Sequence, residues 1–470
     1  MRKTAMDISS ESLTPGIWLM PFAGTWNDPF FAERQSWFAK REDGTPFDTN
    51  WGGTCLDMTN PEVQAYLKAN IERIVREWGY RYLKMDGLWT GSAADIQYVN
   101  DAYKDDQLGN SRLMNPNKTQ IEALRDGLRL IRETAGREVF LLGCCAPQNM
   151  RSYGGAYGMV DAMRIGPDNG ATVDGLLVGP RYGSRNYFMN GRVWWNDPDP
   201  VYVRTNLSLS QAELSCTWVG ITGQLTVASD DLQVLPQERL HVLQRIMPTH
   251  RGWARPVDWL DRDMPRVWVA GSKGEQEARI VGLFNWDQER LKIDEPLERL
   301  DLDSKREYAG YEFWSNQFLP SITGRLQFEL EPLGDGKFAS AERSSGKMRR
   351  CCASLAIRPL EDRPQILSTS RHITQGLVDV VIEEWDGGKK ELRGTSRVVG
   401  GDPYELRILT RALNAHWRVT GMKVSAEDEK AGVKIEEKAG EQGLARGTIS
   451  SSDAREVKWS IQFRETERTP

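Results

Sequence analysis

The stretch Tyr80-Arg-Tyr-Leu-Lys-Met-Asp-Gly-Leu-Trp89 places a cation and a carboxylate two residues apart. If the stretch is a strand, Lys84 and Asp86 share one face, because side chains alternate along a strand. Asp86 is followed at once by Gly87, as is typical where a strand passes into a loop. A Lys this close favours an ionised carboxyl group, which predicts that Asp86 is a nucleophile or an electrostatic anchor. A surface ion pair at a strand end is the structural alternative.

Three further predicted strand ends carry acids. Arg164 and Asp168 lie on one strand, and Pro167 bends the chain so that Asp168 can lean over the edge of the sheet. Two other strands end in Asn196-Asp197-Pro198-Asp199 and Ser229-Asp230-Asp231. Any one of these acids could cap a helix or form a turn. Several acids at one edge of a sheet are more typical of a catalytic site.

Two carboxylates with opposed roles are what glycoside hydrolysis requires: one attacks the anomeric carbon, and the other protonates the leaving oxygen and then activates water. We expect Asp86 to be the nucleophile, held ionised by Lys84. Asp168 has no adjacent Lys and is expected to be the acid/base, with Arg164 free to engage the sugar. Aspartic-type hydrolysis, metal-dependent isomerisation and Schiff-base chemistry at Lys84 are less well supported alternatives.

The elements that must position these residues alternate between strand and helix. Short apolar strands are predicted at residues 14–22, 80–89, 139–145, 162–168, 193–199 and 221–230. Helices are predicted at residues 60–78, 118–135, 203–218 and 236–247. This order predicts an α/β fold with a parallel sheet and helices outside it, and polar residues at the strand ends favour a (β/α)8-type barrel. An open doubly wound sheet is the alternative, but no strand is followed by a GxGxxG loop.

From about residue 262 the helical periodicity stops and alternating strands begin, which predicts antiparallel β structure. We divide the chain into a barrel at 1–261, an antiparallel β domain at 262–375 and a second β-sandwich-like domain at 376–470. Residues 335–350 are polar and lack an apolar period, so we expect an exposed insertion there.

Composition excludes several classes of function. The hydrophobic content of 39% and the charged content of 27% are typical of a soluble globular protein. The net charge is −5 and there is no long basic run, so a nucleic-acid partner is not expected. No apolar stretch reaches the ~20 residues that span a membrane. The 17 Trp residues weakly favour a carbohydrate ligand, because aromatic faces stack on sugar rings.

Cysteine and histidine spacing argues against a metal or cofactor. The six Cys residues form two adjacent pairs and two singletons, which resembles neither a disulfide framework nor a zinc motif. The four His residues are scattered, so a His-based metal site or a Ser-His-Asp triad is not expected. We predict no cofactor and chemistry based on carboxylates.

Five motifs occur in the order of barrel strands: Pro15-Gly-Ile-Trp-Leu-Met-Pro-Phe22, Leu83-Lys-Met-Asp-Gly87, Leu142-Gly-Cys144, Arg164-Ile-Gly-Pro-Asp168 and Trp195-Asn-Asp-Pro-Asp199. Together they resemble the retaining α-galactosidases of glycoside hydrolase family 36 and their relatives in family 27 (clan D). The resemblance covers roughly residues 14–320 and extends into the β domain after the barrel.

The resemblance implies a metal-free double displacement that removes terminal α-linked galactose from an oligosaccharide or glycoconjugate. Asp86 matches the nucleophile and Asp168 the acid/base. The positions that match substrate contacts or their support are Lys84, Arg164, Cys144 and Asp199, with Trp18 and Trp26 as sugar platforms.

The same resemblance implies that the first two barrel strands lie upstream of Met1, so we expect an incomplete barrel. Related alternatives are an α-N-acetylgalactosaminidase, for which Cys144, Cys145 and Ala146 would leave room at the 2-position, and a galactosyltransferase of the clan. A truncated, non-catalytic sugar-binding remnant is the alternative outside enzymes. Homo-oligomerisation and cellular location are left open.

Overall fold

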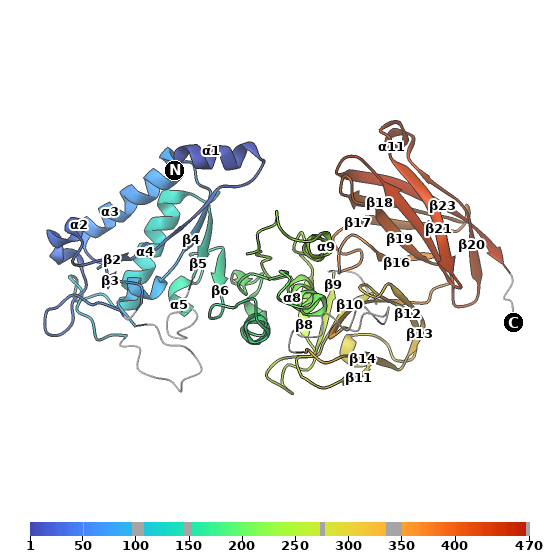
Figure 1. Ribbon diagram of the computed structural model, residues 1–470, viewed down its shortest axis with the longest axis horizontal. Helices are drawn as coiled ribbons and strands as arrows, with labels where there is room; N and C mark the ends of the chain where they lie inside the picture. The colour runs from blue at the N-terminus through green and yellow to red at the C-terminus, as the bar shows by residue number, and fades with distance from the viewer. Residues whose placement is uncertain (50, 96–107, 145–152, 273–277, 335–349, 467–470) are drawn as a thin grey trace. The chain divides into compact units, whose positions relative to one another are not determined.

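The computed structural model describes residues 1–49, 51–95, 108–144, 153–272, 278–334 and 350–466 (Figure 1). The predicted insertion at 335–350 therefore lies outside the described residues except for Arg350. The chain forms two compact units, which we describe separately. The first comprises Met1–Asn169 and Arg185–Asp199, and the second comprises Gly170–Ser184 and Pro200–Pro470. The predicted domain boundaries at 261 and 375 stay predictions.

The first unit is built on a five-stranded parallel sheet. Its strands are β1 (Gly16–Leu19), β4 (Tyr82–Met85), β5 (Phe140–Gly143), β6 (Ala162–Arg164) and β7 (Trp195–Asp197). They lie side by side in that order, and every pair is parallel. Within the described part of the chain β1 and β7 are edges, so the parallel α/β sheet is confirmed but a closed barrel is not.

Two helices pack on this sheet, and their ends follow local sequence signals. Helix α3 (Pro61–Glu72) begins at Asn60, whose side chain accepts the Glu62 amide, and continues as a π-helical turn η2 (Arg73–Glu77). Helix α4 (Gln120–Ala135) begins with a capping box between Thr119 and Glu122. Both helices were predicted, with α4 starting two residues later than the sequence indicated.

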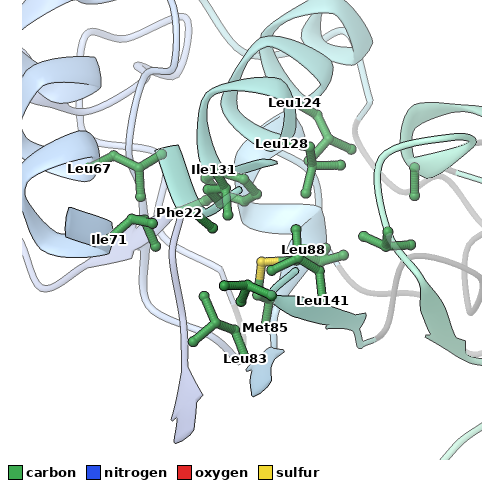
Figure 2. Close-up of a cluster of buried hydrophobic side chains, with 14 of the residues drawn as sticks. Phe22, Leu67, Ile71, Leu83, Met85, Leu88, Leu124, Leu128, Ile131 and Leu141 are labelled. Carbon is green, nitrogen blue, oxygen red and sulfur yellow. The ribbon is translucent and has the colours of Figure 1, made fainter. Parts of the chain in front are cut away.

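Alternation along β4 separates a core face from a polar face. Leu83 and Met85 are fully buried and point toward the helices, where α4 contributes Leu124, Leu128 and Ile131 (Figure 2). Tyr82 and Lys84 are only half-buried and lie on the opposite face. The core therefore fixes which face of the sheet is left for the predicted catalytic residues.

Shorter elements join these layers. The amphipathic segment at the start of the chain is helix α1 (Arg2–Ser10). The predicted long loop contains an antiparallel pair, β2 (Ala23–Gly24) and β3 (Thr54–Cys55), with α2 (Pro29–Ala32) and η1 (Gln35–Trp37) between them. The other short elements of this unit are η3 (Leu88–Ser92), α5 (Tyr153–Ala156) and η5 (Tyr187–Met189).

The prediction of a sixth parallel strand at residues 221–230 was wrong. Helix α8 (Leu209–Thr222) runs into this segment and ends at Gly223, which adopts a φ of 66°. Beyond it, Ala228 makes only an isolated parallel bridge with Val201. The helix has a capping box on Ser208, five residues after the predicted start at 203, and it ends four residues after the predicted end at 218. The second unit also contains α6 (Val173–Leu176), α7 (Val178–Arg185, whose last residue belongs to the first unit), and α9 (Gln237–Gln244).

Antiparallel structure follows, as predicted. A six-stranded sheet has the order β13 (Gln317–Thr323), β12 (Glu307–Glu312), β15 (Cys352–Pro359), β10 (Arg279–Phe284), β9 (Val267–Gly271) and β8 (Trp253–Pro256). It is accompanied by the pair β11 (Leu291–Pro296) and β14 (Arg325–Leu330), and by η6 (Leu297–Leu300). Buried aliphatic side chains from both sheets form one core.

The last part of the chain forms two four-stranded antiparallel sheets that share a core. One has the order β16 (Gln365–Thr369), β19 (Tyr404–Leu409), β22 (Leu444–Ser450) and β21 (Lys434–Glu441). The other has the order β17 (Val380–Asp386), β18 (Glu391–Val398), β23 (Arg455–Thr466) and β20 (His416–Val424), and α11 (Ala426–Lys430) lies between β20 and β21 in the chain.

Candidate active site

The register of the parallel sheet aligns the predicted site residues. Met85, Gly143, Met163 and Asn196 are paired across β4, β5, β6 and β7. Side chains alternate, so the next residue of each strand lies on the opposite face, away from the helical core. That row, at the C-terminal edge of the sheet, contains Asp86, Cys144, Arg164 and Asp197. Four strands thus bring three predicted site residues, and Asp197, to one edge.

Among the described residues, two N–H groups donate hydrogen bonds to Asp86. The Gly87 amide donates to its Oδ1 at 2.8 Å, and the Trp18 indole Nε1 donates to its Oδ2 at 3.0 Å. Trp18 reaches it from β1, the neighbouring strand, and about half of the Trp18 side chain stays exposed. Donors of this kind favour a charged carboxylate. Trp18 was predicted to be a sugar platform, and the structure gives it a contact with the predicted nucleophile.

Lys84 does not have the role that the sequence argument gave it. Among the described residues no ion pair of 4.0 Å or less joins Lys84 to Asp86. Lys84 is aligned instead with Trp18 and Leu142, one layer below Asp86 on the same face. Two residues of strand separate the two layers by about 7 Å. The indole and the amide donate to the carboxylate.

Arg164 contacts two further acids, Asp168 and Asp199. Its guanidinium Nη2 donates to Asp168 Oδ1 at 2.8 Å and lies 2.9 Å from Asp199 Oδ2. The Arg164 side chain is 3% exposed and that of Asp199 10%, whereas the Asp168 side chain is 90% exposed. The predicted acid/base, Asp168, therefore has a solvent-exposed carboxyl group, one oxygen of which accepts a hydrogen bond from the buried Arg164.

Burial and charge act against each other in this cluster. Burial raises the pKa of Asp199 to about 6, although the Arg164 charge and the Asn169 amide oppose the rise. For Arg164, burial would lower the pKa, but the interactions with the Asp199 and Asp197 carboxylates and the hydrogen bond to Asp168 outweigh it and hold the pKa above its ordinary value. Arg164 stays charged, while Asp199 is placed to titrate near neutral pH.

Asp199 keeps a backbone conformation that L residues rarely adopt, with a φ of 74°. Its amide donates to Asp197 Oδ1 at 2.9 Å, and its Oδ2 accepts the Asn169 amide at 2.9 Å. A non-glycine residue with positive φ persists only where its surroundings enforce it. Here these bonds turn the Asp199 carboxylate onto Arg164.

The remaining predicted residues differ in how firmly they are placed. Cys144 is buried, its amide donates to the Met85 carbonyl at 2.7 Å, and its side chain packs against Trp89. Trp26 is exposed, and its amide donates to Thr54; none of the contacts recorded for the described residues brings it to Asp86. Of the small residues that were predicted to flank the 2-position, Cys145 and Ala146 lie outside the described residues.

Two aromatic residues near the site were missed by the sequence argument. Trp51 is exposed, and its ring lies 5.1 Å from that of buried Trp89 at an angle of 42°. Tyr82 stacks on Phe140 at 5.3 Å on the same face as Lys84, and burial together with Asp197 raises its pKa to about 12. The two glycines after Trp51 are the local signal for a turn that exposes its ring. The position of Tyr82 on the face of Lys84 follows from the alternation of side chains along β4.

Two features of the described residues bear on other functions. They contain no group of three or more His, Cys, Asp or Glu side chains that could hold a metal ion. No helix among them combines the length and apolarity that crossing a bilayer demands.

No known family model matches the chain. Among solved structures, it is similar to a GH27 β-L-arabinopyranosidase from Geobacillus stearothermophilus, with 15% identity and a TM-score of 0.54 over 76% of this chain and 77% of that one. A variant of that enzyme with bound arabinose is 14% identical, with a TM-score of 0.55 over 76% of this chain and 77% of that one. α-Galactosidase I from Mortierella vinacea is 11% identical, with a TM-score of 0.48 over 76% of this chain and 79% of that one. The chain thus has the mixed α/β fold, with parallel and antiparallel sheets, of a glycoside hydrolase.

Proposed function

We propose that this protein is a retaining glycoside hydrolase that removes terminal α-linked galactose, with Asp86 as nucleophile and Asp168 as acid/base. The observation that carries the proposal is the alignment of Asp86 with Arg164 along one strand-end row, on the face away from the helical core. Asp168 joins this row through Arg164. The glycoside hydrolase fold and the resemblance to families 36 and 27 agree with it.

In the first step Asp86 attacks the anomeric carbon while Asp168 gives its proton to the leaving oxygen. The two N–H donors on Asp86 hold its carboxylate charged and fix its direction. In the second step the Asp168 carboxylate takes a proton from water, and that water releases the sugar from Asp86. Retention follows because each displacement inverts the anomeric carbon.

Asp168 must carry a proton when the first step begins, yet it is in contact with Arg164 in this structure. Asp199 offers a resolution, because the same Arg164 nitrogen also lies beside it. As Asp199 ionises, Arg164 has an alternative partner, and substrate hydroxyls can compete for the rest of the guanidinium. Arg164 thus acts both as a sugar contact and as the shared partner of Asp168 and Asp199.

A second substrate, a β-L-arabinopyranoside, is favoured by the similarity to the Geobacillus enzyme. This sugar has the ring of an α-D-galactoside without the C6 hydroxymethyl group, so the same two carboxylates could cleave it. A third candidate substrate is an N-acetylgalactosaminide, because the small side chain of Cys144 lies in the strand-end row beside Asp86.

The experiment compares hydrolysis of nitrophenyl α-D-galactopyranoside, β-L-arabinopyranoside and α-N-acetylgalactosaminide by the wild type and Asp86→Ala. We expect α-galactoside cleavage by the wild type and a loss of at least a thousandfold in the variant, because the covalent intermediate cannot form. Asp231→Ala, which removes an exposed acid outside the row, is the matched control and should keep wild-type rates. Full activity in Asp86→Ala excludes the mechanism, and a wild type inert on all three glycosides favours a sugar-binding remnant.

A further inference from the structure

The second unit contains a cavity of about 650 Å³ that the proposed chemistry does not use. It is lined by α8 and α9 on one side, by the β12–β13 turn on another, and by residues of β19, β22 and the turn before β19. Its volume is within the range of small-molecule sites. All its described lining residues belong to this unit, so the cavity is distinct from the strand-end row that holds Asp86.

The charged groups around the cavity are already paired. The pairs are Arg245 with Asp402 at 2.6 and 2.7 Å, Arg350 with Glu213 at 2.7 Å, and Arg407 with Glu405 at 2.7 Å. Each arginine thus has its own acidic partner, although burial raises the pKa of Glu213 to about 7 against the opposing charge of Arg350. An anionic ligand would have to displace one of these carboxylates, and a cation would have to displace an arginine. The pairs therefore favour an uncharged ligand.

The two other titratable groups on the lining do not change this balance. Burial and the Arg245 charge lower the pKa of His241, so its imidazole is neutral at pH 7. Glu238 is more than half exposed and lies 3.9 Å from Arg239, so its charge is solvated rather than directed into the cavity. The carboxylate oxygens and guanidinium N–H groups of the lining offer both acceptors and donors, which is what a ligand rich in hydroxyl groups needs.

An aromatic ring completes the lining. Trp314 is half-buried, and its indole Nε1 donates to Thr217 Oγ1 of α8 at 2.8 Å. Phe313 packs edge-on against it, with ring centres 5.1 Å apart and planes at 85°. The polar edge of the indole is thus used internally and the ring is held in place, which leaves ring surface rather than a donor for a ligand. A fixed indole beside paired charges is suited to the apolar face of a sugar ring.

We propose that this cavity is a second carbohydrate-binding site, separate from the candidate active site, and that it takes an uncharged oligosaccharide. Trp314 is the stacking platform, and the Glu213–Arg350 and Asp402–Arg245 pairs bind hydroxyl groups. The proposal rests on the cavity alone and does not require that the strand-end row be catalytic.

The test measures binding in the full chain carrying Lys84→Ala and Asp86→Ala, which removes two groups of the candidate active site. The probes are stachyose, maltotriose and cellotriose, titrated by calorimetry and by quenching of tryptophan fluorescence. We expect one or more to bind with millimolar or tighter affinity. Thr448→Tyr, which adds a ring to the cavity at a half-buried residue, should weaken that binding at least tenfold while the fold is retained.

Trp314→Phe, which keeps a ring, should weaken binding less than Trp314→Ala. In the otherwise wild-type chain, Thr448→Tyr should leave nitrophenyl-glycoside hydrolysis unchanged, so a failure here is distinguishable from a failure of the proposed activity. The proposal is overturned if none of the three sugars binds, if Thr448→Tyr binds them as well as its parent, or if inorganic phosphate occupies the cavity in their place.

Discussion

At the scale of single residues, the Trp18 indole is a hydrogen-bond partner of Asp86. The sequence placed Lys84 two positions from Asp86 and suggested an ion pair, because a strand puts both on one face. The fold instead turns the Trp18 indole of the neighbouring strand onto the carboxylate. A contact between strands depends on register, which no local pattern in either segment encodes.

Trp18→Phe removes the N–H donor from Asp86 and keeps an aromatic ring. A hydrogen bond to a charged group contributes about 1.5–3 kcal/mol, so kcat on an aryl α-galactoside should fall roughly ten- to hundredfold. Trp37→Phe is the control, because its indole also donates to a carboxylate, that of Glu62 at 2.6 Å, outside the row. Equal effects of the two substitutions on kcat would mean that Trp18 does not act through Asp86.

Asp199 predicts a pH dependence of stability. Its folded pKa of about 6 is above the value of 3.8 for an ordinary Asp, so the folded state binds the proton more tightly than the unfolded state. The free energy of unfolding should therefore fall by roughly 1–3 kcal/mol as pH rises from about 4 to 6, and then level off.

Asp199→Asn should lose this contribution. Urea titrations of the wild type and the variant at pH 4.5 and 7.0 give the difference, with Asp231→Asn as the control. A wild type whose loss of stability between these pH values is the same as that of Asp199→Asn would contradict the assignment.

At the scale of elements, the sequence predicted the strands and helices that build the first unit, and it failed where packing overrides periodicity. Asn60-Pro61 and the Thr119–Glu122 capping box are local signals, and α3 and α4 begin at them. Residues 221–230 contain strand-forming residues, but α8 is buried along nearly its whole length and extends into them. An apolar segment buried on all sides has no periodicity that distinguishes a helix from a strand.

Gly87 connects β4 to the predicted site, and a side chain there should be costly. Its φ is 62°, and an added Cβ would lie 2.5 Å from Met20 Cε. Gly79 has a φ of 88° with no atom within 4 Å of an added Cβ. Gly87→Ala and Gly79→Ala should each lose about 1 kcal/mol of stability from backbone strain.

Only Gly87→Ala should also lower kcat, at least tenfold, because it moves the amide that donates to Asp86. Thermal unfolding and aryl-galactoside kinetics on both variants measure the two effects. If the two variants lose activity in proportion to their loss of stability, Gly87 has no role in positioning Asp86.

At the scale of the whole molecule, the sequence predicted the α/β fold class and the antiparallel strands after residue 262. The strand-end row was predictable only in part. Asp86, Cys144 and Arg164 could be placed at strand ends, but their alignment required the register. The cavity beside Trp314 could not be predicted, because it brings together residues from positions 209 to 448 that share no motif.

The opposed roles of Asp86 and Asp168 are the centre of the proposed mechanism. Azide can replace a missing carboxylate, and the configuration of the product reports which one it replaces. In Asp86→Ala, azide attacks the free substrate once and displaces the aryl group with inversion. In Asp168→Ala, azide attacks the sugar already bound to Asp86, so the product retains its configuration.

The decisive measurement is therefore the NMR assignment of the galactosyl azides formed by the two variants from nitrophenyl α-D-galactopyranoside. We predict the β-azide from Asp86→Ala and the α-azide from Asp168→Ala. The reverse assignment, or the same anomer from both variants, would contradict the roles proposed for these two carboxylates.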